Sequence, residues 1–366
     1  MNDKKNLLFI SSHLPSEKIP QAGQKIALDI LRNHSDEYNV FLVSFYNNFE
    51  KKYLDKKTYE FCRETYLFHI SNLNKLMAIA THISSPLKSV VRVHKKAENK
   101  IAELQSRINF DVVHFYFTEA SYYLKLFNNS PTHSIITQID VCYQAIDRKR
   151  KVAPIFSKFL YDFEYKRQKK WELEVLNKSD SITVLNSKDK NILVNDGIPD
   201  NKITIIKPLI SESFKQISRN HIEKNTILFW GAMNRNENVD AVKWFLKEIF
   251  PRICAIFPDA KLYIVGANPP REIVKLQSSN IAITGFVDNP LQFFEKCHVA
   301  VAPLRLGAGI KIKVLEYLEA GLPVVATPVG AEGIEHKNLV VVDQAADFSR
   351  AVLKLFEEPL TEGNFL

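Results

Sequence analysis

The chain has 366 residues, of which 46% are hydrophobic and 25% are charged. This composition is typical of an ordinary soluble globular protein, and the length suggests about two domains. No apolar run approaches the length of a transmembrane helix. The four cysteines follow neither a disulfide-rich nor a zinc-binding spacing, so we expect reduced thiols in a cytosolic protein (Cys62, Cys142, Cys254 and Cys297).

The excess of positive charge lies in the first half of the chain. Residues 1–210 contain 32 Lys and Arg against 23 Asp and Glu, whereas residues 211–366 contain 17 against 18. This asymmetry indicates an anionic partner for the first half, which could be a membrane surface, a nucleic acid or an anionic substrate.

Short β-branched and aromatic runs alternate with helical stretches through the first half. His114 lies near the end of one such run, where it could contact a sugar and act in catalysis, or could equally be a hydrogen-bonded core histidine. Asp140 directly follows another run and could line a ligand site. The runs predict strands at residues 6–11, 40–46, 111–117, 134–139, 181–186 and 203–208.

A basic segment with interleaved aromatic residues covers residues 147–171. It holds nine Lys and Arg, and residues 87–100 form a second basic stretch. Such a segment could lie on anionic lipid or accommodate an acceptor carried on a lipid diphosphate, or it could be a solvated helix face with its aromatics toward the core.

The second half repeats the alternation of strands and helices. Residues 239–257 carry apolar residues at helical spacing, and residues 210–225 form the most polar break in the chain. We therefore predict two doubly wound α/β domains, 1–210 and 211–366, with a ligand site beyond the carboxyl ends of the strands. The strands predicted here cover residues 226–231, 260–266, 281–286, 299–304, 323–328 and 339–343.

The most informative stretch is LRLGAGIKIKVLEYLEAGLPVVAT, residues 304–327. A strand runs into a turn with Gly307 and Gly309, and the turn opens a helix. Glycines permit close approach of a phosphate to the backbone, and the helix presents its positive end. Lys311 and Lys313 add cations where the helix dipole disfavours them, unless an anion lies between them.

Two further charged residues complete this pattern. Arg305 could join the cations from the strand end, and Glu316 shares a helix face with Lys313, from which it could accept hydrogen bonds from a ribose diol. The pattern indicates a nucleoside-diphosphate site. A capped helix whose Lys313 and Glu316 pair in solvent is the alternative, although a second glycine-rich turn follows directly at 330–333.

With these residues the chain resembles the family 4 retaining glycosyltransferases (glycosyl transferases group 1). That family has the GT-B fold, in which two doubly wound Rossmann-like domains face each other across a cleft. The resemblance covers residues 227–251, 260–270, 283–289 and 302–334 in order and spacing, and more weakly 9–31, 110–116, 178–193 and 202–214.

The resemblance implies roles for individual residues. Glu316 matches the second glutamate of the family's Glu-x7-Glu motif, which binds the donor ribose, and with Lys313 it is an expected participant in catalysis. Gly23 matches a glycine loop of the acceptor domain that approaches the diphosphate. The donor site implied by the match comprises Gly285, Phe286, Val287, Arg305, Gly307, Ala308, Gly309, Ile310, Lys311, Lys313 and Glu316.

The chain departs from the family pattern at three positions. The first glutamate of the motif falls at Ala308, so the identity of the transferred sugar is open. An Arg and a Lys that many members carry after the first strand of this domain fall at Ala232 and Asn238. Neutralisation of the phosphates is then expected from Arg305, Lys311 and Lys313. The chain also ends soon after residues 348–359, where the family usually adds a crossover helix.

The implied function is transfer of a sugar, with retention, from a UDP- or GDP-sugar to a glycan or polyprenyl-diphosphate-linked acceptor. No Asp-x-Asp triplet is present, so we expect a metal-independent hexosyltransferase that needs no cofactor besides its nucleotide-sugar substrate. A cytoplasmic location, with possible attachment to the inner membrane face, follows. The alternatives are a nucleotide-sugar epimerase of the same fold, a phosphorylase, a degenerate binding module, or a basic protein that binds membrane or nucleic acid, although no nucleic-acid signature is present.

Overall fold

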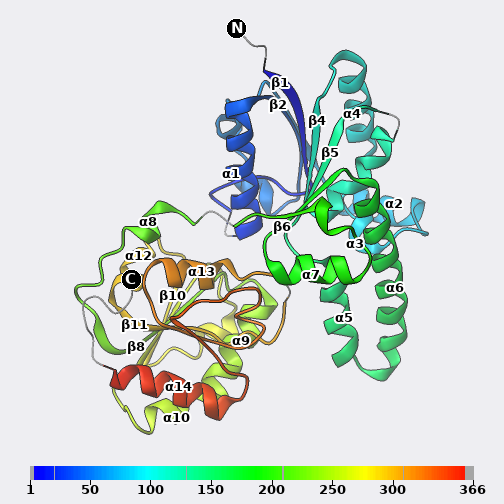
Figure 1. Cartoon of the computed structure of the whole chain (residues 1–366). Helices are drawn as coiled ribbons and strands as arrows, with labels where there is room; N and C mark the ends of the chain where they lie inside the picture. The colour runs from blue at the N-terminus through cyan, green and yellow to red at the C-terminus, as the bar shows by residue number, and fades with distance from the viewer. Residues whose placement is uncertain (1–3, 20, 129, 208–209, 308, 359–366) are drawn as a thin grey trace. The chain divides into compact units, whose positions relative to one another are not determined.

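The computed structural model describes residues 4–19, 21–128, 130–207, 210–307 and 309–358 (Figure 1). The chain divides into two compact units, Met1–Pro208 and Leu209–Leu366, which we call the N-terminal and C-terminal units. Each is described by itself below. The division falls close to the boundary expected at residue 210.

The described part of the N-terminal unit contains a seven-stranded parallel sheet in the order β3-β2-β1-β4-β5-β6-β7. The first strand is central, and the chain winds outward from it in both directions, as in doubly wound folds. The strands are β1 (Lys5–Ser11), β2 (Tyr38–Tyr46), β3 (Glu64–His69), β4 (Val112–Tyr116), β5 (His133–Gln138), β6 (Ser181–Val184) and β7 (Ile203–Ile205).

Helices cover both faces of this sheet. Helix α1 packs beside β1 and β2. The main hydrophobic core of the unit includes residues of α4, α6 and α7. The helices are α1 (Ala22–Glu37), α2 (Asn72–Thr81), α3 (Leu87–Val90), α4 (Lys95–Arg107), α5 (Cys142–Val152), α6 (Ile155–Lys178) and α7 (Ser187–Asn195), with 3-10 turns η1 (Glu50–Tyr53), η2 (Lys56–Tyr59), η3 (Thr118–Phe127) and η4 (Asp200–Lys202).

The C-terminal unit repeats this topology with six parallel strands among the described residues, in the order β10-β9-β8-β11-β12-β13. The strands are β8 (Glu223–Trp230), β9 (Lys261–Val265), β10 (Ile281–Gly285), β11 (Cys297–Ala302), β12 (Val324–Ala326) and β13 (Leu339–Val341). The helices are α8 (Glu212–Lys215), α9 (Asn236–Trp244), η5 (Phe245–Ile249), α10 (Phe250–Cys254), α11 (Arg271–Val274), α12 (Leu291–Lys296), α13 (Ile312–Glu319) and α14 (Ala345–Glu357).

Successive residues of β8 enter different cores. Ile227 and Phe229 pack with α9, α10 and α14, whereas Leu228 packs with α12 and α13 on the other face. A strand buried on both faces needs apolar side chains at every position, which is why these strands appear as continuous apolar runs in the sequence. The predicted α/β fold with two doubly wound sheets is confirmed.

Two local features differ from the sequence prediction. Strand β3 was missed, because its six residues are all half-buried at the edge of the sheet and include only a short apolar run, 66–68. The helix expected over 239–257 is interrupted by the π-helical turn η5, directly before Pro251. Proline has no N–H and its ring displaces the carbonyl four residues earlier, so a regular α-helix cannot continue through it.

Candidate functional site

Glycines stand at the carboxyl ends of three neighbouring strands in the C-terminal unit. Gly231 N–H donates to Val265 O at 2.9 Å, and Gly266 N–H donates to Gly285 O at 3.2 Å. A Cβ on Gly266 would lie 1.9 Å from Gly231 O, so no other residue fits there. These glycines leave backbone rather than side chains at this edge of β8, β9 and β10. The sequence prediction included only Gly285.

The turn between β11 and α13 lies next in this row of strand ends. Gly307 and Gly309 have φ values of 108° and 71°, a left-handed conformation that favours glycine. Lys311 is the residue that precedes α13, and its Nζ donates back to Gly309 O. Ala308, which takes the place of the family's first glutamate, lies outside the described residues.

Lys313 extends from the first turn of α13 toward the end of β8. Its Nζ donates to Asn238 Oδ1 at 2.7 Å and lies 4.5 Å from the centre of the Phe229 ring. Asn238 in turn donates to Ala232 O at 2.7 Å, so both positions where the family often carries cations instead hold Lys313 in place. Burial, together with the charge of Arg235, lowers the pKa of Lys313 to about 7.

Glu316 lies one turn further along α13 and contacts the same strand end. The Trp230 indole N–H donates to Glu316 Oε2 at 2.9 Å, and the backbone N–H of Trp230 donates to Tyr317 Oη at 2.6 Å. Helix α13 is thereby fixed to the end of β8 at consecutive residues. Lys313 and Glu316 thus both bond residues of the β8–α9 region, which the capped-helix alternative did not anticipate.

Glu332 is a site residue that the sequence prediction missed. It follows β12, is 5% exposed, and its Oε2 lies 3.5 Å from Lys311 Nζ. Its loop is held closely against β11, because a Cβ on Gly330 would lie 2.3 Å from Ala302 O. The glycine-rich turn at 330–333 was visible in the sequence, but nothing there indicated that its acid would reach Lys311.

The structure gives Arg305 a different partner from the one expected. Its guanidinium donates to both carboxylate oxygens of Asp240 on α9, with Nε 3.0 Å from Oδ2, and it lies 5.3 Å from the Trp244 ring. This bidentate pair holds Arg305 on the exposed side of α9. Of the three expected cations, Lys311 bonds the glycine turn and Lys313 reaches the end of β8, whereas Arg305 is engaged by α9.

The predicted base-binding loop follows β10. Gly285 has a φ of 68°, and Phe286 beyond it is 74% exposed, whereas Val287 packs against the α12–α13 core. Ile310 packs partly into the same core. An exposed aromatic ring at a strand end is available to stack on a flat ligand.

His114 lies in the core of the N-terminal unit, so its expected contact with a sugar is not supported. The ring is 4% exposed and lies 2.9 Å from His34 Nε2 and 2.7 Å from Thr137 Oγ1. Burial holds the pKa of His114 well below its usual range, so the ring is neutral. The alternative, a hydrogen-bonded core histidine, describes it.

Gly23 and Asp140 both lie near the carboxyl edge of the N-terminal sheet. A Cβ on Gly23, in the first turn of α1, would lie 2.9 Å from the Phe117 ring, so this helix start is closely packed. Asp140 Oδ1 lies 3.8 Å from Lys88 Nζ, which also lies 3.7 Å from Glu119 Oε1. Asp140 thus belongs to an ion-pair cluster with Lys88 and Glu119.

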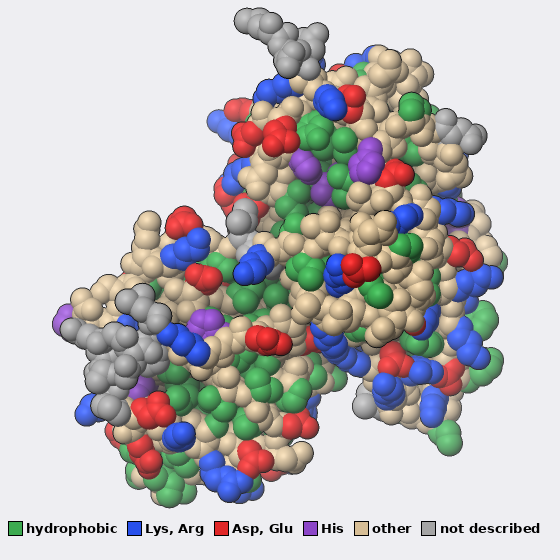
Figure 2. All heavy atoms as spheres, viewed as in Figure 1, with side chains coloured by type: hydrophobic (Ala, Val, Ile, Leu, Met, Phe, Trp, Pro, Cys, Tyr) green, Lys and Arg blue, Asp and Glu red, His purple; other side chains and the backbone are tan. Residues whose placement is uncertain are grey.

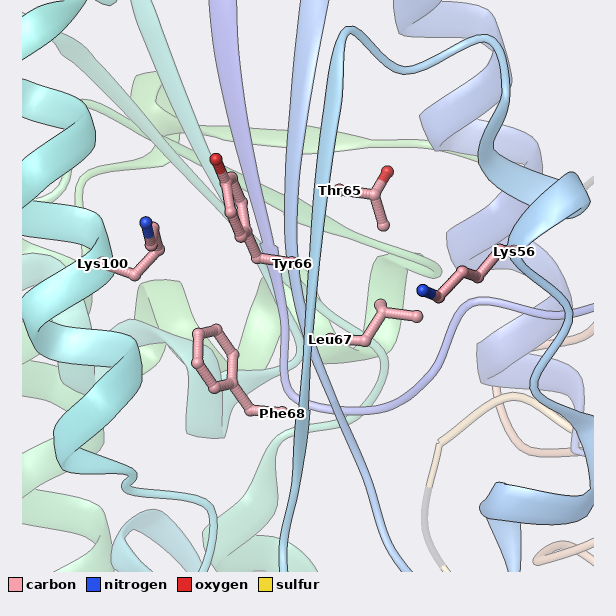
Figure 3. Close-up of a pocket in the computed structure, with 6 residues that line it drawn as sticks. All are labelled: Lys56, Thr65, Tyr66, Leu67, Phe68 and Lys100. Atoms are coloured by element: carbon pink, nitrogen blue, oxygen red, sulfur yellow. The ribbon is translucent and has the colours of Figure 1, made fainter.

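A hollow at the free edge of the N-terminal sheet is lined by residues that do not form a convergent site. Figure 3 shows Tyr66, Phe68 and Lys100 on one side of the edge strand β3, and Thr65, Leu67 and Lys56 on the other. Lys100 Nζ lies over the Tyr66 ring at 4.8 Å. These residues wrap around a strand edge and do not converge on one point, so we do not place the site there.

The described residues show neither a metal-binding cluster nor a membrane-spanning helix. No group of three or more His, Cys, Asp or Glu side chains in them could hold a metal ion. None of their helices combines the length and the apolar character needed to cross a bilayer.

Comparison with known families identifies the class of the C-terminal unit. Residues 224–358 match the family described as "Glycosyl transferases group 1". These residues include the glycine row, the turn at 307–309 and all of α13. The C-terminal unit is thus similar to the group 1 glycosyl transferases over most of its length, and the resemblance found in the sequence is confirmed at this level. Membership of family 4 in particular stays a prediction.

The chain is also similar to individual proteins and solved structures. The chain is 22% identical over 277 residues to an uncharacterized 44.6 kDa protein in the cps region of Klebsiella pneumoniae, covering 70% of this chain and 68% of that one. Its fold is similar to that of Anabaena HepE in complex with UDP (TM-score 0.65, 11% identity, 96% and 90% of the two chains). It is also similar to the lipopolysaccharide outer core galactosyltransferase WaaB (TM-score 0.60, 12% identity, 96% and 90%). The GT-B fold is therefore established.

Proposed function

We propose that the protein transfers a sugar from a nucleoside-diphosphate sugar to a glycan acceptor. The observation that carries this proposal is the group formed by Lys311, Lys313 and Glu316 beside the 307–309 turn. Two cations and a turn rich in backbone N–H groups suit a diphosphate, and the nearby carboxylate suits a ribose diol. The UDP in the Anabaena structure and the group 1 family support the same ligand class.

In this proposal the residues act on the leaving diphosphate. Lys313, held by Asn238 and lying against the Phe229 ring, would neutralise the charge that develops as the bond from the sugar to the diphosphate breaks. Lys311 would assist from the other side of the turn. Glu316, oriented by the Trp230 indole, would accept hydrogen bonds from the ribose and so fix the donor. Retention at the anomeric carbon, transfer of a hexose and independence from metal ions belong to the proposal.

The acceptor is proposed to be a lipid-linked or surface polysaccharide chain. The relative in the Klebsiella cps region and the similarity to a lipopolysaccharide galactosyltransferase support this choice. The positive charge of residues 1–210 suits an acceptor carried on a lipid diphosphate at the cytosolic face of a membrane. We further propose that this N-terminal unit binds the acceptor and that Gly23 and Asp140 lie near it.

The first test is thermal unfolding with UDP, GDP, dTDP and CMP. A nucleotide at a hundredfold excess over its Kd should stabilise the protein by about 2.7 kcal/mol. The nucleotide that does so identifies the donor, and its sugar conjugates are then incubated with and without lipid-linked glycan. Nucleotide release that requires the acceptor supports transfer. Conversion of the sugar without an acceptor would indicate an epimerase, and no stabilisation by any nucleotide would contradict a donor site.

A further inference from the structure

Helices α5 and α6 form a hairpin with an unusual surface at its turn. Figure 1 shows the two helices side by side, extending away from the sheet of the N-terminal unit. At the start of α6 large apolar side chains face solvent, with exposed fractions between 53% and 90%. We call this group the apolar stripe; it comprises Ile155, Phe156, Phe159, Leu160 and Phe163.

The spacing of these residues places them on one side of the helix. At 100° per residue, positions 155, 156, 159, 160 and 163 span an arc of about 140°. The stripe therefore forms one continuous face, in contrast to single apolar residues scattered over a surface, which are common. Ile83 extends it, since it is 75% exposed and its carbonyl accepts a hydrogen bond from Arg167 of α6.

Cations surround the stripe. Residues 147–171 hold nine Lys and Arg against Asp147, Asp162 and Glu164. Arg150 pairs with both aspartates, but within the described residues Lys149, Lys158 and Lys166 are exposed and have no ion pair. Figure 2 shows basic and hydrophobic side chains gathered together over this hairpin.

Two of the cations follow the apolar stripe along the axis of α6, further from the turn of the hairpin. Lys166 and Lys170 fall on the same helix face as the stripe, and Lys166 follows Phe159 by about 10 Å along the axis. For a hairpin that enters the membrane tip-first, this axial distance is close to the depth of about 5–10 Å to which interfacial apolar side chains enter the acyl boundary. With the stripe at that depth, the ammonium groups lie at the level of the lipid headgroups.

We propose that the α5–α6 hairpin inserts its apolar stripe into an anionic lipid surface. Charge complementarity favours lipid over a second copy of this chain, because self-association through the stripe would bring two positively charged segments together. Each exposed lysine near an anionic surface strengthens the attachment, and the attraction weakens with salt. The proposal does not depend on transferase activity.

The test is vesicle flotation in the absence of nucleotide. Vesicles of phosphatidylcholine alone are compared with vesicles that also contain phosphatidylglycerol. The wild type should float with the anionic vesicles at low salt. The double variant Phe156→Ser/Phe159→Ser should lower the partition coefficient by roughly tenfold or more, because two large apolar side chains no longer enter the bilayer. The matched control is Ile256→Ser, which changes an apolar residue of the C-terminal unit that is 61% exposed.

A charge variant separates the two contributions. Lys158→Glu/Lys166→Glu should lose binding to the phosphatidylglycerol vesicles, whereas Lys247→Glu, at an 82% exposed side chain of the C-terminal unit, should not. A Phe159→Trp variant should show blue-shifted emission on the anionic vesicles. Circular dichroism should be unchanged in every variant, since the substituted side chains are exposed.

Three results would overturn the proposal. The wild type could stay in solution with both vesicle types, or the stripe variant could float as the wild type does. Sedimentation could also show a wild-type dimer that the stripe variant abolishes, in which case a second copy covers the stripe. Because no nucleotide is present, none of these results bears on the donor site.

Discussion

The carboxyl edges of the two sheets share a topology but differ in the partners that surround their buried charged side chains. In the N-terminal unit Glu50 is 1% exposed and accepts hydrogen bonds from Gln24 Nε2 at 2.9 Å and from the Asn47 N–H at 2.7 Å. Arg92 Nη1 lies 3.3 Å from Glu50 Oε2, the oxygen that accepts from Asn47. In the C-terminal unit Lys313 is held by a neutral amide and an aromatic ring.

The difference in partners indicates which of the two charged groups would gain from a bound ligand. A buried carboxylate with a buried guanidinium and several N–H donors is satisfied by the protein itself. A half-buried ammonium whose pKa has fallen to about 7 carries a desolvation cost that an anion would remove. The N-terminal edge around Glu50 is a structural network, whereas we propose that the C-terminal edge around Lys313 binds a negatively charged ligand.

The largest effect is expected from Glu50→Gln, which breaks the structural network. The change leaves the Arg92 guanidinium buried without its counter-ion, so the free energy of unfolding should fall by about 3 kcal/mol. Urea denaturation measures this loss. Glu103→Gln, at an exposed pair with Lys100, is the control and should change stability by less than about 0.5 kcal/mol. A loss of nucleotide affinity without a loss of stability would contradict the structural role.

The same network predicts a dependence on acid. Burial alone would raise the pKa of Glu50, but the contact with His13 and the charge of Arg92 hold it at about 2. A carboxyl whose pKa is lowered in the folded state stabilises the protein above its unfolded pKa of about 4.5, and the contribution is lost as the pH falls toward 2. The wild type should therefore lose more stability over this range than Glu50→Gln does.

The second effect in size is expected from Lys313→Met. Removing the cation should weaken UDP and pyrophosphate binding by roughly a hundredfold, since a hydrogen bond to a charged group contributes about 1.5–3 kcal/mol. Titration calorimetry measures both ligands. Lys243→Met, a change in a cation of α9 that pairs with Glu272, is the matched control. Unaltered pyrophosphate affinity in Lys313→Met would remove Lys313 from the site.

The same variant should be more stable than the wild type without ligand. The folded-state pKa of Lys313 lies below its usual 10.5, so the folded chain binds fewer protons than the unfolded chain between pH 7 and 10.5. The stability of the wild type therefore rises with pH across this window, and the penalty is fully present below pH 7. Lys313→Met should raise the melting temperature most below pH 7, and a lower melting temperature there would contradict this account.

A smaller effect is expected from Trp230→Phe, which removes the indole donor to Glu316 and keeps an aromatic ring beside Phe294. UDP binding should weaken by roughly fivefold to tenfold, as is usual for the loss of a single hydrogen bond of about 1 kcal/mol. Pyrophosphate, which has no ribose, should bind as in the wild type. Equal weakening of both ligands would show that Trp230 acts on the whole turn and not through Glu316.

The smallest effect is expected from Arg305→Ala. Because the guanidinium is engaged by Asp240 on the exposed side of α9, UDP affinity should change by less than about twofold. A tenfold loss would show that Arg305 leaves Asp240 for the diphosphate, as the sequence alone had suggested.

The fold was predictable because each buried strand leaves its own mark in a short stretch of sequence. Strands buried on both faces need apolar residues at consecutive positions, and this requirement can be read directly at 226–231 or 299–304. The edge strand β3 has no such requirement and was missed. For residues 147–171 the sequence left open whether the aromatics face lipid or the core, and the structure shows the large apolar side chains at the start of α6 exposed.

The site was predictable only where its residues share one element. Lys311 directly precedes α13, and Lys313 and Glu316 lie within it, so their spacing placed the three residues together. Trp230 and Glu332 reach the same place from other strands, and only the sheet order brings them there. Arg305 and His114 show the converse, since competing partners such as Asp240 and His34 cannot be read from the sequence.

The most direct test of the central claim is the proton balance of UDP binding at about pH 8. At this pH the free Lys313 is largely neutral, and an adjacent diphosphate should raise its pKa and draw a proton from solution. Calorimetry in buffers of different ionisation enthalpy counts that proton. The account predicts net proton uptake by the wild type, no uptake by Lys313→Met at saturating UDP, and weaker binding as the pH rises further. UDP binding without proton uptake, or equal uptake by both proteins, would contradict it.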